Sequence, residues 1–585
     1  MVNGPEDPSF DWDAVDWRTC EQEVRRLRQR IFKATQEQDW AKVRSLQKLM
    51  LRSRSNTLLS VRQVTQRNAG RKTAGVDRKV ALTSAARAQM TERVRQGIGS
   101  WKPLPVRRVY IPKAQGKQRP LGIPVILDRC HQARVRNALE PEWEARFEPR
   151  SYGFRPGRSC HDAIEVLYNT LRGKRSKRVW ILDADLKAAF DRIDHTYLLS
   201  TLGKFPARDL IAGWLKAGVF EAGKGLTPTD EGTPQGGVIS PLLMNVALHG
   251  LEEAAGVRYR TEPSKAGDTA PGAPVLVRFA DDFVACCHSR QEAQQVRERL
   301  AGWLTQRGLS FNEDKTTLVH IADGFDFLGF NLRGYPNRKL LIKPSKTAVR
   351  RIRERLAAEM RSLRGSNAVA VIARLAPIVR GWAAYYRGVV SARVFQSLDA
   401  YTWHLTWRWA RRGHSRKSRT WIVDRYYGQF NKFRGDHWVF GDRDSGGYLV
   451  KFSWTPIVRH TLVKGRSSPD DPAQAEYWAR RRTRVKPPLD GYTLRLLTRQ
   501  EARCPLCGDH LLSAEQPPQS PQEWERWWQT VTRKAIAADY LRNVGGPGSP
   551  DGDHIRLVHA GCHRGHLTRV RNSPALHSSA PSRPA

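Results

Sequence analysis

The stretch Val275-Leu276-Val277-Arg278-Phe279-Ala280-Asp281-Asp282-Phe283-Val284-Ala285-Cys286 places two adjacent carboxylates between two apolar runs. This pattern predicts a β-hairpin with Asp281 and Asp282 at its tight turn. Two carboxylates at one turn are costly unless a cation lies between them. Mg²⁺ is the expected cation, because it is hard, takes oxygen ligands and keeps coordination sites open for phosphates. For the pair alone, a solvated Asp-Asp turn is the alternative.

The composition indicates a large folded protein with a polyanionic partner. The length of 585 residues predicts about three to five domains. The net charge of +42, from 99 basic and 57 acidic side chains, exceeds what solubility requires and predicts salt-dependent binding of a polyanion. Hydrophobic residues make up 40% of the chain, which is typical of a folded protein rather than of a disordered basic tail.

Targeting signals are not evident in the sequence. No run of 18 apolar residues predicts a transmembrane helix, and residues 1–17 lack the basic start and apolar segment of a signal peptide. Of eight cysteines, only Cys504 and Cys507 have a spacing typical of metal ligands. We therefore expect a reducing, cytoplasmic location without a membrane partner.

A third carboxylate follows a second apolar strand. The strand ends at Asp183 to Asp185, and a turn then leads into a helix. The carbonyl of Leu186 could add a backbone ligand, and Phe190 could lie under the same site. A helix-capping Asp and a core Phe are the alternative. Together with the hairpin pair, Asp185 completes a set that can hold two metal ions about 3.5–4 Å apart, one at a 3′-hydroxyl and one at a leaving pyrophosphate.

A basic hairpin is predicted upstream of these acids. Residues 106–113 and 118–124 have the pattern of two strands, and residues 114–117 that of their turn. Lys113 and Arg119 flank the turn and could project toward one triphosphate, since Arg offers a planar fork and Lys a point charge. An exposed basic hairpin without a ligand is the alternative.

Two further segments have the composition of functional loops. Residues 151–159 are so rich in Gly, Pro and Arg that this backbone could approach another one closely. Residues 231–243 carry Gly236-Gly237 before an apolar helix opened by Ser240-Pro241, an arrangement that can hold a phosphate or a flat base. Ordinary surface loops are the alternative for both. Farther on, residues 291–304 predict an amphipathic helix and residues 325–330 a short apolar strand.

The regions on either side of this core are helical and basic. Residues 18–68 keep a helical apolar stripe, and we expect their Arg-rich face to contact nucleic acid. Residues 345–420 carry 17 Lys and Arg against 3 acids and predict a helical bundle whose exterior forms an RNA or DNA track. Residues 421–500 are basic and aromatic, with a helix predicted at residues 477–482.

These motifs, in this order, resemble those of the group II intron reverse transcriptase/maturase family. The resembling segments are Arg107–Pro124, Ser151–Gly157, Asp185–Asp191, Thr233–Gly237, Phe279–Asp282, Gly308–Thr316, Phe327–Phe330, and Gly381-Trp382 with Tyr385-Tyr386. Phe279 stands where many members have Tyr; because the ring is kept, we expect polymerase activity to survive.

The resemblance implies an α+β right-hand polymerase that copies RNA into DNA with two Mg²⁺ ions and dNTPs. It also implies binding of the group II intron RNA, assistance to splicing, and insertion into target DNA. Asp185, Asp281 and Asp282 would be catalytic, Phe190 would exclude a ribose 2′-hydroxyl, and Gln235 and Gly236 would belong to the template loop. The implied domains are an N-terminal helical extension (1–100), fingers and palm (101–340), an all-helical thumb/maturase domain (341–420), a DNA-binding region (421–500) and an HNH-like module (501–585).

The C-terminal segment predicts a zinc site. Cys504 and Cys507, with the distant His559 and Cys562, can close a tetrahedral Zn²⁺ site, although His563 or His566 could replace His559. The arrangement resembles the HNH endonuclease module that ends many family members, but no His lies between His510 and His554 to act as its general base. His554 stands where the family usually has Asn, and His563 matches the last His. We therefore expect a zinc-stabilised DNA-binding remnant with weak or no nuclease activity.

Two other functions remain open at this point. A splicing-only maturase, an RNA-binding protein without useful polymerase activity, would not need all three carboxylates. A domesticated reverse transcriptase acting in defence or diversification would not need the maturase-like bundle and the HNH-like tail. The oligomeric state is not indicated by the sequence.

Overall fold

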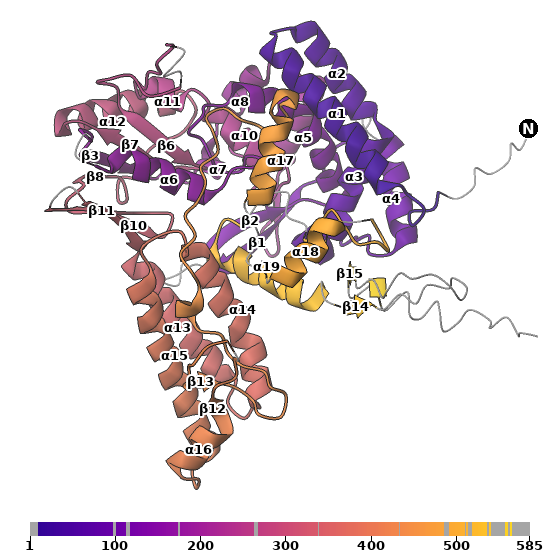
Figure 1. Cartoon of the computed structure of the whole chain (residues 1–585). Helices are drawn as coiled ribbons and strands as arrows, with labels where there is room; N and C mark the ends of the chain where they lie inside the picture. Colours follow the sequence, from indigo (N-terminus) through magenta and orange to yellow (C-terminus); the bar gives the residue numbers. More distant parts are fainter. Residues whose placement is uncertain are drawn as a thin grey trace, which may run out of the picture.

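The computed structural model describes residues 10–96, 101–112, 118–173, 176–262, 267–336, 339–431, 433–484, 489, 491–508, 511–512, 518–534, 537–539, 556–559 and 562–563. Its N-terminal part is helical, as predicted (Figure 1). The helices are α1 Trp17–Gln36, α2 Trp40–Arg52, α3 Arg54–Arg62, α4 Ser84–Gln96 and α5 Ile126–Arg146. The side chain of Asp16 caps α1 by accepting from the backbone N–H groups of Arg18 and Thr19.

A four-stranded sheet, here called the central sheet, is formed by strands from the middle part of the chain. Its strands are β3 Trp180–Ala184, β6 Val275–Phe279, β7 Asp282–Cys287 and β8 Thr317–His320, in the order β6-β7-β3-β8 with antiparallel neighbours. The predicted hairpin is confirmed, because Phe279 pairs with Asp282 and leaves Ala280-Asp281 as a two-residue turn. Strand β6 is at the edge of this sheet.

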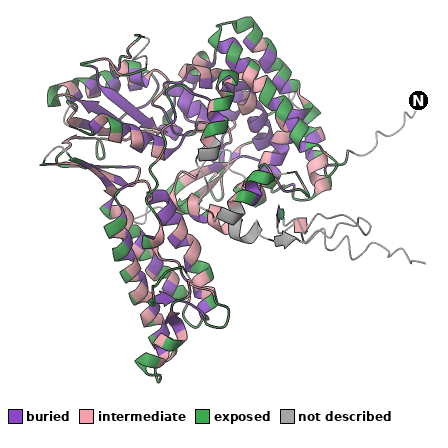
Figure 2. Cartoon of the chain, viewed as in Figure 1, coloured by how far each residue is buried: buried purple, intermediate pink, exposed green. Residues whose placement is uncertain are grey.

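The central sheet is buried on both faces, which explains its apolar strands (Figure 2). Leu182 and Phe283 belong to a first core that also includes α1, α2, α5 and helices between residues 195 and 305. Ile181 and Val284, from the opposite face, belong to a second core with the helix over residues 160–171 and the bundle that follows residue 345. The surrounding helices are α6 Cys160–Leu171, α7 Ala189–Arg192, α8 His195–Leu202, α9 Arg208–Lys216, α10 Ser240–Ala247, α11 Leu251–Ala254 and α12 Arg290–Thr305.

The predicted basic hairpin belongs to a second sheet. Its strands are β1 Val106–Pro112, β2 Gln118–Ile123, β4 Val219–Glu221 and β5 Gly225–Thr227, in the order β2-β1-β4-β5. Strands β1 and β2 are antiparallel, as predicted, whereas β1 and β4 are parallel. The hairpin turn, residues 113–117, lies outside the described residues, and Lys113 with it.

The prediction of one strand over residues 325–330 was wrong. The chain forms β9 Phe325–Phe327, β10 Phe330–Tyr335 and β11 Lys339–Pro344, and it reverses at Leu328-Gly329, where φ is 51° and 83°. The hydroxyls of Tyr385 and Tyr386 donate to the carbonyls of Leu328 and Gly329 at 2.9 and 3.1 Å. These contacts from distant residues hold the turn within a largely apolar stretch of the sequence. The predicted domain boundary at residues 340/341 therefore falls inside β11.

The predicted helical bundle is confirmed by α13 Lys346–Ser362, α14 Ala368–Tyr386, α15 Ala392–Gly413 and α16 Arg419–Tyr426. It extends away from the central sheet (Figure 1). Among the described residues, α14 is the one helix whose length and apolar composition would also suit a membrane span. Val371 and Leu375 of α14 are fully buried in the second core, which accounts for that composition.

The chain returns from the bundle to the rest of the molecule, which the sequence did not predict. After the short ladder of β12 Tyr427–Gly428 and β13 Val439–Phe440, residues 456–484, here called the return segment, include α17 Ala475–Arg484. Arg28 of α1 forms ion pairs with Asp470 of this segment at 2.6 Å and with Glu140 of α5 at 2.8 Å. The return segment thereby joins the N-terminal helices to the central part of the molecule.

Asp162, at the start of α6, is the second anchor of the return segment. Its fully buried carboxylate contacts His460 Nε2 at 2.8 Å and accepts from the Val463 N–H at 2.9 Å. Burial alone would raise the pKa of Asp162, but the hydrogen bond and charge of His460 outweigh it and lower the pKa to about 2. Asp162 is thus held ionised over the whole ordinary pH range.

We predict that Asp162→Asn destabilises the protein by about 3–5 kcal/mol at pH 7, because one member of a buried pair is removed. A depressed carboxyl pKa stabilises the fold above the unfolded value of 3.8 and loses this effect as the pH falls toward 2. The urea midpoints of wild type and variant should therefore differ at pH 7, begin to converge below about pH 4 and be closest near pH 2. Equal midpoints at pH 7 would contradict the prediction, and exposed Asp209→Asn is the control.

The C-terminal part contains α18 Gly491–Arg499, α19 Pro521–Lys534, β14 Ala537–Asp539 and β15 Arg556–Val558. Helix α19 packs against α14 (Figure 1), and the buried Glu525 pairs with Arg355 of α13 at 2.8 Å. Gly381 of α14 permits this packing, since a Cβ there would lie 2.6 Å from the Glu525 backbone nitrogen. The linker predicted near residues 486–488 lies outside the described residues.

Candidate active site and metal centre

The three predicted carboxylates converge at one end of the central sheet. The β3–β7 register pairs Ala184 with Phe283, so that the following residue, Asp185, lies across from Asp282. The side chains of Asp185 and Asp282 share a hydrogen bond, and Asp281 is in the adjacent turn. The alternative of a solvated turn is wrong for these acids, because Asp281 and Asp282 are only partly exposed.

Burial and like charge dominate the electrostatics of this cluster. Burial, the charge of Asp281 and the contact with Asp185 raise the pKa of Asp282 to about 8. Burial, followed by the charge of Asp185, also raises the pKa of Asp281. Burial opposes ionisation of Asp185 as well, but hydrogen bonds from Lys315 and Asp282 outweigh it and lower its pKa. Ionising all three carboxylates therefore has a high free-energy cost here unless a cation is bound.

Sequence reasoning missed two neighbours of Asp185. Lys315 Nζ donates to Asp185 Oδ2 at 2.7 Å, and Asn312 Nδ2 donates to the same oxygen at 2.9 Å. Both lie in the segment 308–316, which resembles a family motif but for which the sequence predicted no function. A lone Lys among the acids of Asn312-Glu313-Asp314-Lys315 was the available signal.

The donor set fits Mg²⁺. The side-chain atoms of Asp185, Asp281 and Asp282 that could bind a metal are carboxylate oxygens, which a hard divalent ion prefers. The cation would also relieve the repulsion that raises the pKa of Asp282. Leu186 follows Asp185 directly and bridges to Phe311, and its carbonyl as a further ligand stays a prediction.

Two of the predicted substrate-binding residues contact each other. Arg119 of β2 donates from Nε to Gln235 Oε1 at 2.8 Å, and the Gly122 N–H donates to the Gln235 carbonyl at 2.8 Å. Gly236 has a φ of 127°, and a Cβ there would lie 2.7 Å from the Gly122 carbonyl oxygen. The loop after Thr233 is thus held against the basic hairpin by glycine-dependent contacts.

Phe190 lies next to the same loop. Its side chain is buried, and its carbonyl accepts from the Thr233 N–H at 2.6 Å. Its ring meets the ring of Phe154 edge to face, with centroids 6.1 Å apart. Phe154 is strained, because its φ of 61° is rare for an aromatic residue. The proposed effect of Phe190 on sugar selection stays a prediction.

The loop of residues 151–159 closely approaches the hairpin that carries Asp281 and Asp282, as its composition predicted. The Tyr152 N–H donates to the Arg278 carbonyl at 2.9 Å, and the Arg278 N–H donates to the Arg150 carbonyl at 3.0 Å. A Cβ at Gly153 would lie 2.2 Å from the Ala280 nitrogen, so only glycine fits. The loop therefore covers edge strand β6 directly before its turn.

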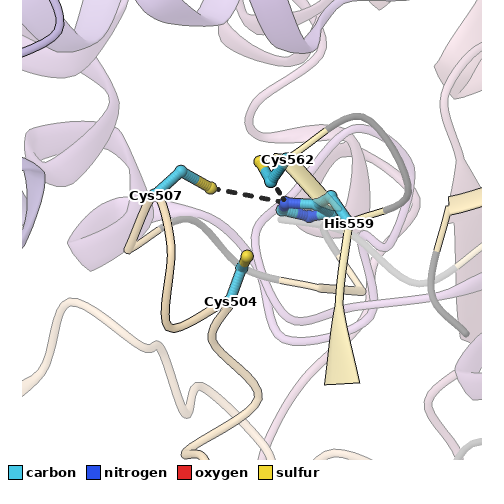
Figure 3. A group of neighbouring side chains, drawn as sticks. All are labelled: Cys504, Cys507, His559 and Cys562. Atoms are coloured by element: carbon cyan, nitrogen blue, oxygen red, sulfur yellow. Dashed lines mark hydrogen bonds between the residues drawn. The ribbon is translucent and has the colours of Figure 1, made fainter. Parts of the chain in front are cut away.

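The structure brings the four predicted zinc ligands together (Figure 3). Ligand atoms of Cys504, Cys507, His559 and Cys562 all lie within 4.8 Å of one another. His559 Nδ1 is 3.4 Å from Cys507 Sγ and 3.8 Å from Cys562 Sγ. Tetrahedral Zn²⁺, with bonds of about 2.3 Å to sulfur and 2.0–2.1 Å to nitrogen, requires about 3.6 Å between such atoms. The donor set and spacing thus fit a structural zinc ion.

The other C-terminal histidines considered from the sequence are His554, His563 and His566. His563 lies beside the cluster, and its N–H donates to the His559 carbonyl at 2.9 Å. His554 and His566 lie outside the described residues. Among the described residues, His559 is thus the histidine that lies in the cluster, and the nuclease-related roles of His554 and His563 stay predictions.

Three family models match the chain in sequence. The model described as "Reverse transcriptase (RNA-dependent DNA polymerase)" matches residues 111–332. Those described as "N-terminal domain of reverse transcriptase" and "Group II intron, maturase-specific domain" match residues 12–94 and 349–427. The carboxylate cluster lies within the first of these, and the bundle within the last.

Individual relatives agree with these matches. Protein YkfC of Escherichia coli K12 is 37% identical over 261 residues, which is 40% of this chain and 68% of that protein. The group II intron-encoded protein LtrA of Lactococcus lactis is 31% identical over 40% of this chain, which spans about half (48%) of LtrA. Maturase-like protein 1 of Euglena gracilis is 26% identical over 63% of this chain and 76% of that protein.

Among solved structures, telomerase from Candida albicans matches with a TM-score of 0.31 and 14% identity, covering 54% of this chain and 60% of that one. That score is too low to define a shared fold. The sequence matches and the carboxylate-bearing sheet define a chain of the reverse transcriptase class. With its maturase-specific domain and its similarity to LtrA, the chain belongs to the group II intron reverse transcriptase/maturase family.

Proposed function

We propose that this protein is an RNA-directed DNA polymerase that binds its group II intron RNA, assists splicing and supports mobility by target-primed reverse transcription. The observation that carries the proposal is the convergence of Asp185, Asp281 and Asp282 at the end of the central sheet. The family membership supports the RNA substrate and the maturase role. Under this proposal, the central and second sheets form palm and fingers, and the bundle forms the thumb.

The chain's own residues prepare the reaction by positioning and charge. Mg²⁺, when bound, would activate the primer 3′-hydroxyl and neutralise the leaving pyrophosphate. Lys315 and Asn312 orient Asp185 through hydrogen bonds to one of its oxygens. Arg119, with Lys113, would bind the triphosphate, and Phe190 would exclude a 2′-hydroxyl.

The basic bundle supports nucleic-acid binding. A groove of about 560 Å³ lies between α13 and α15. Its lining includes four cations, one acid and one aromatic ring: Lys346, Arg350, Arg353, Arg361, Glu354 and Tyr401. A cationic rim with an aromatic side chain suits a phosphate backbone with stacked bases. We propose this surface as part of the intron RNA or template contact.

Primer extension on poly(rA)/oligo(dT) tests the polymerase proposal. We expect Mg²⁺-dependent product from wild type and none from Asp281→Ala, because the cluster would lose one of its three carboxylates. The exposed Asp209→Asn should remain active. Failure of wild type to extend the primer would instead favour the splicing-only maturase, whose RNA binding would persist.

For the C-terminal module, we propose a structural Zn²⁺ ion held by Cys504, Cys507, His559 and Cys562. The spacing of these ligand atoms supports a tetrahedral site. By resemblance, the module is an HNH-like remnant that contacts target DNA with weak or no cleavage. Metal-dependent nicking of supercoiled DNA by wild type, abolished by His563→Ala, would refute the loss of nuclease activity.

A further inference from the structure

Arg278 is a buried cation directly before the catalytic turn, and neither the sequence nor the family comparison assigns it a role. Its side chain is 1% exposed, and Nη1 donates to Asn245 Oδ1 at 2.9 Å and to the Ala280 carbonyl at 3.1 Å. Within the described part of the chain, its Nε and Nη2 atoms have no hydrogen-bond partner, and no carboxylate lies within ion-pair distance. A neutral side chain would be cheaper to bury here.

The free-energy cost of burying the Arg278 cation coincides with a strained residue two positions away, Ala280. Ala280 has a φ of 59°, which a residue with a Cβ adopts only when its surroundings enforce it. Two contacts do so, one at the nitrogen and one at the carbonyl of the residue. Gly153 packs against the Ala280 nitrogen, and Arg278 donates to the Ala280 carbonyl.

Asn245 of α10 connects these two contacts. Its Oδ1 accepts from Arg278, and its Nδ2 donates to the Gly153 carbonyl at 2.9 Å. Asn245 is fully buried, so both hydrogen bonds are sheltered from water. One side chain thereby couples the Arg278 guanidinium to the loop that presses on the turn.

We infer that Arg278 and Asn245 are positioning residues that clamp Ala280 in its left-handed conformation and so orient Asp281 and Asp282 toward Asp185. This inference rests on the proposed polymerase function. The clamp is needed because β6 is an edge strand, which on its outer side near the turn is bridged by the loop containing Gly153. The buried cation is retained because it holds a strained peptide that no apolar side chain could hold.

Steady-state primer extension separates positioning from folding. Arg278→Met keeps the bulk of the side chain but loses both hydrogen bonds, and we expect kcat to fall about 100-fold, as for a misplacement of roughly 1 Å. The KM for dTTP and the affinity for primer–template should change by less than about threefold, because their contacts are intact. Arg278→Lys keeps one cationic donor and should recover at least about tenfold of the loss.

A second variant and a control keep the test independent of stability. Asn245→Leu is close in size and breaks both hydrogen bonds; kcat should fall at least about tenfold, and the double variant should be no worse than Arg278→Met alone. Leu300→Ala, in the core of α12, lowers the melting temperature but should leave kcat within about twofold.

Several results would overturn the inference. These are near-normal kcat in Arg278→Met or Asn245→Leu, an equal loss in Leu300→Ala, or additive losses in the double variant. If Arg278→Met does not fold, the result of Asn245→Leu decides. An inactive wild type would refute the polymerase proposal together with this inference, whereas an active wild type with active clamp variants would refute the inference alone.

Discussion

Replacing Asp282 with Asn is expected to remove DNA synthesis and, at the same time, to stabilise the metal-free protein. Burial of this carboxyl, followed by the charge of Asp281 and the contact with Asp185, raises its pKa to about 8. A neutral amide of the same shape removes this repulsion. It also removes a metal-binding oxygen, so activity should fall at least about 1000-fold, or roughly 4 kcal/mol of transition-state stabilisation.

Primer extension and thermal unfolding with EDTA measure the two effects. Wild type should melt at a higher temperature when Mg²⁺ is added, since the ion binds only the folded state. The melting temperature of Asp282→Asn should be higher than that of wild type in EDTA, and it should rise less when Mg²⁺ is added. The exposed Asp209→Asn is the matched control and should resemble wild type in both measurements. A variant that melts below wild type in EDTA would contradict the electrostatic explanation.

Removal of the C-terminal metal is expected to unfold the module around the Cys/His cluster and to leave the polymerase core folded. Among the residues that the structure describes in this module, six form a buried core: Leu496, Leu497, Cys504, Leu511, Leu557 and Val558. So small a core cannot supply much stability, and metal binding then becomes folding free energy. The Arg503–Glu21 ion pair, at 2.8 Å, joins the module to α1, and both of its side chains are partly exposed.

Cys504→Ser tests this expectation. Elemental analysis should find one zinc per chain in wild type and less than about 0.2 in the variant, since a tetrahedral structural site needs all four ligands. Limited proteolysis should then cut within residues 491–563, while primer extension stays within about threefold of wild type. Cys20→Ser, which changes a buried thiol outside the cluster, should keep its zinc. Full zinc content in Cys504→Ser would refute the assigned ligands.

Local sequence patterns were sufficient to predict the elements that hold the candidate site residues. The apolar runs around Asp281-Asp282 predicted the hairpin, and the helical spacing of apolar residues predicted α12 and α13–α15. The Cys and His spacings identified the four residues that meet in space. These predictions held because alternation, helical periodicity and ligand spacing are short-range properties of the chain.

Other features depend on contacts between distant residues. The turn at Leu328-Gly329 is held by hydroxyls of α14, and the return segment is anchored by Arg28 and Asp162. No local pattern distinguishes such a turn from a continuous strand, or such a segment from a linker.

By itself, therefore, the sequence predicted the family, the three carboxylates and the four Cys/His residues that the structure brings together, because residue types within short motifs mark each of them. Only the tertiary structure decided how the carboxylates are held. Lys315 and Asn312 reach Asp185 from 127 to 130 positions away, and Asn245 reaches Arg278 across 33. Their effect depends on direction and burial, which arise only when the central sheet and its covering loop have packed together.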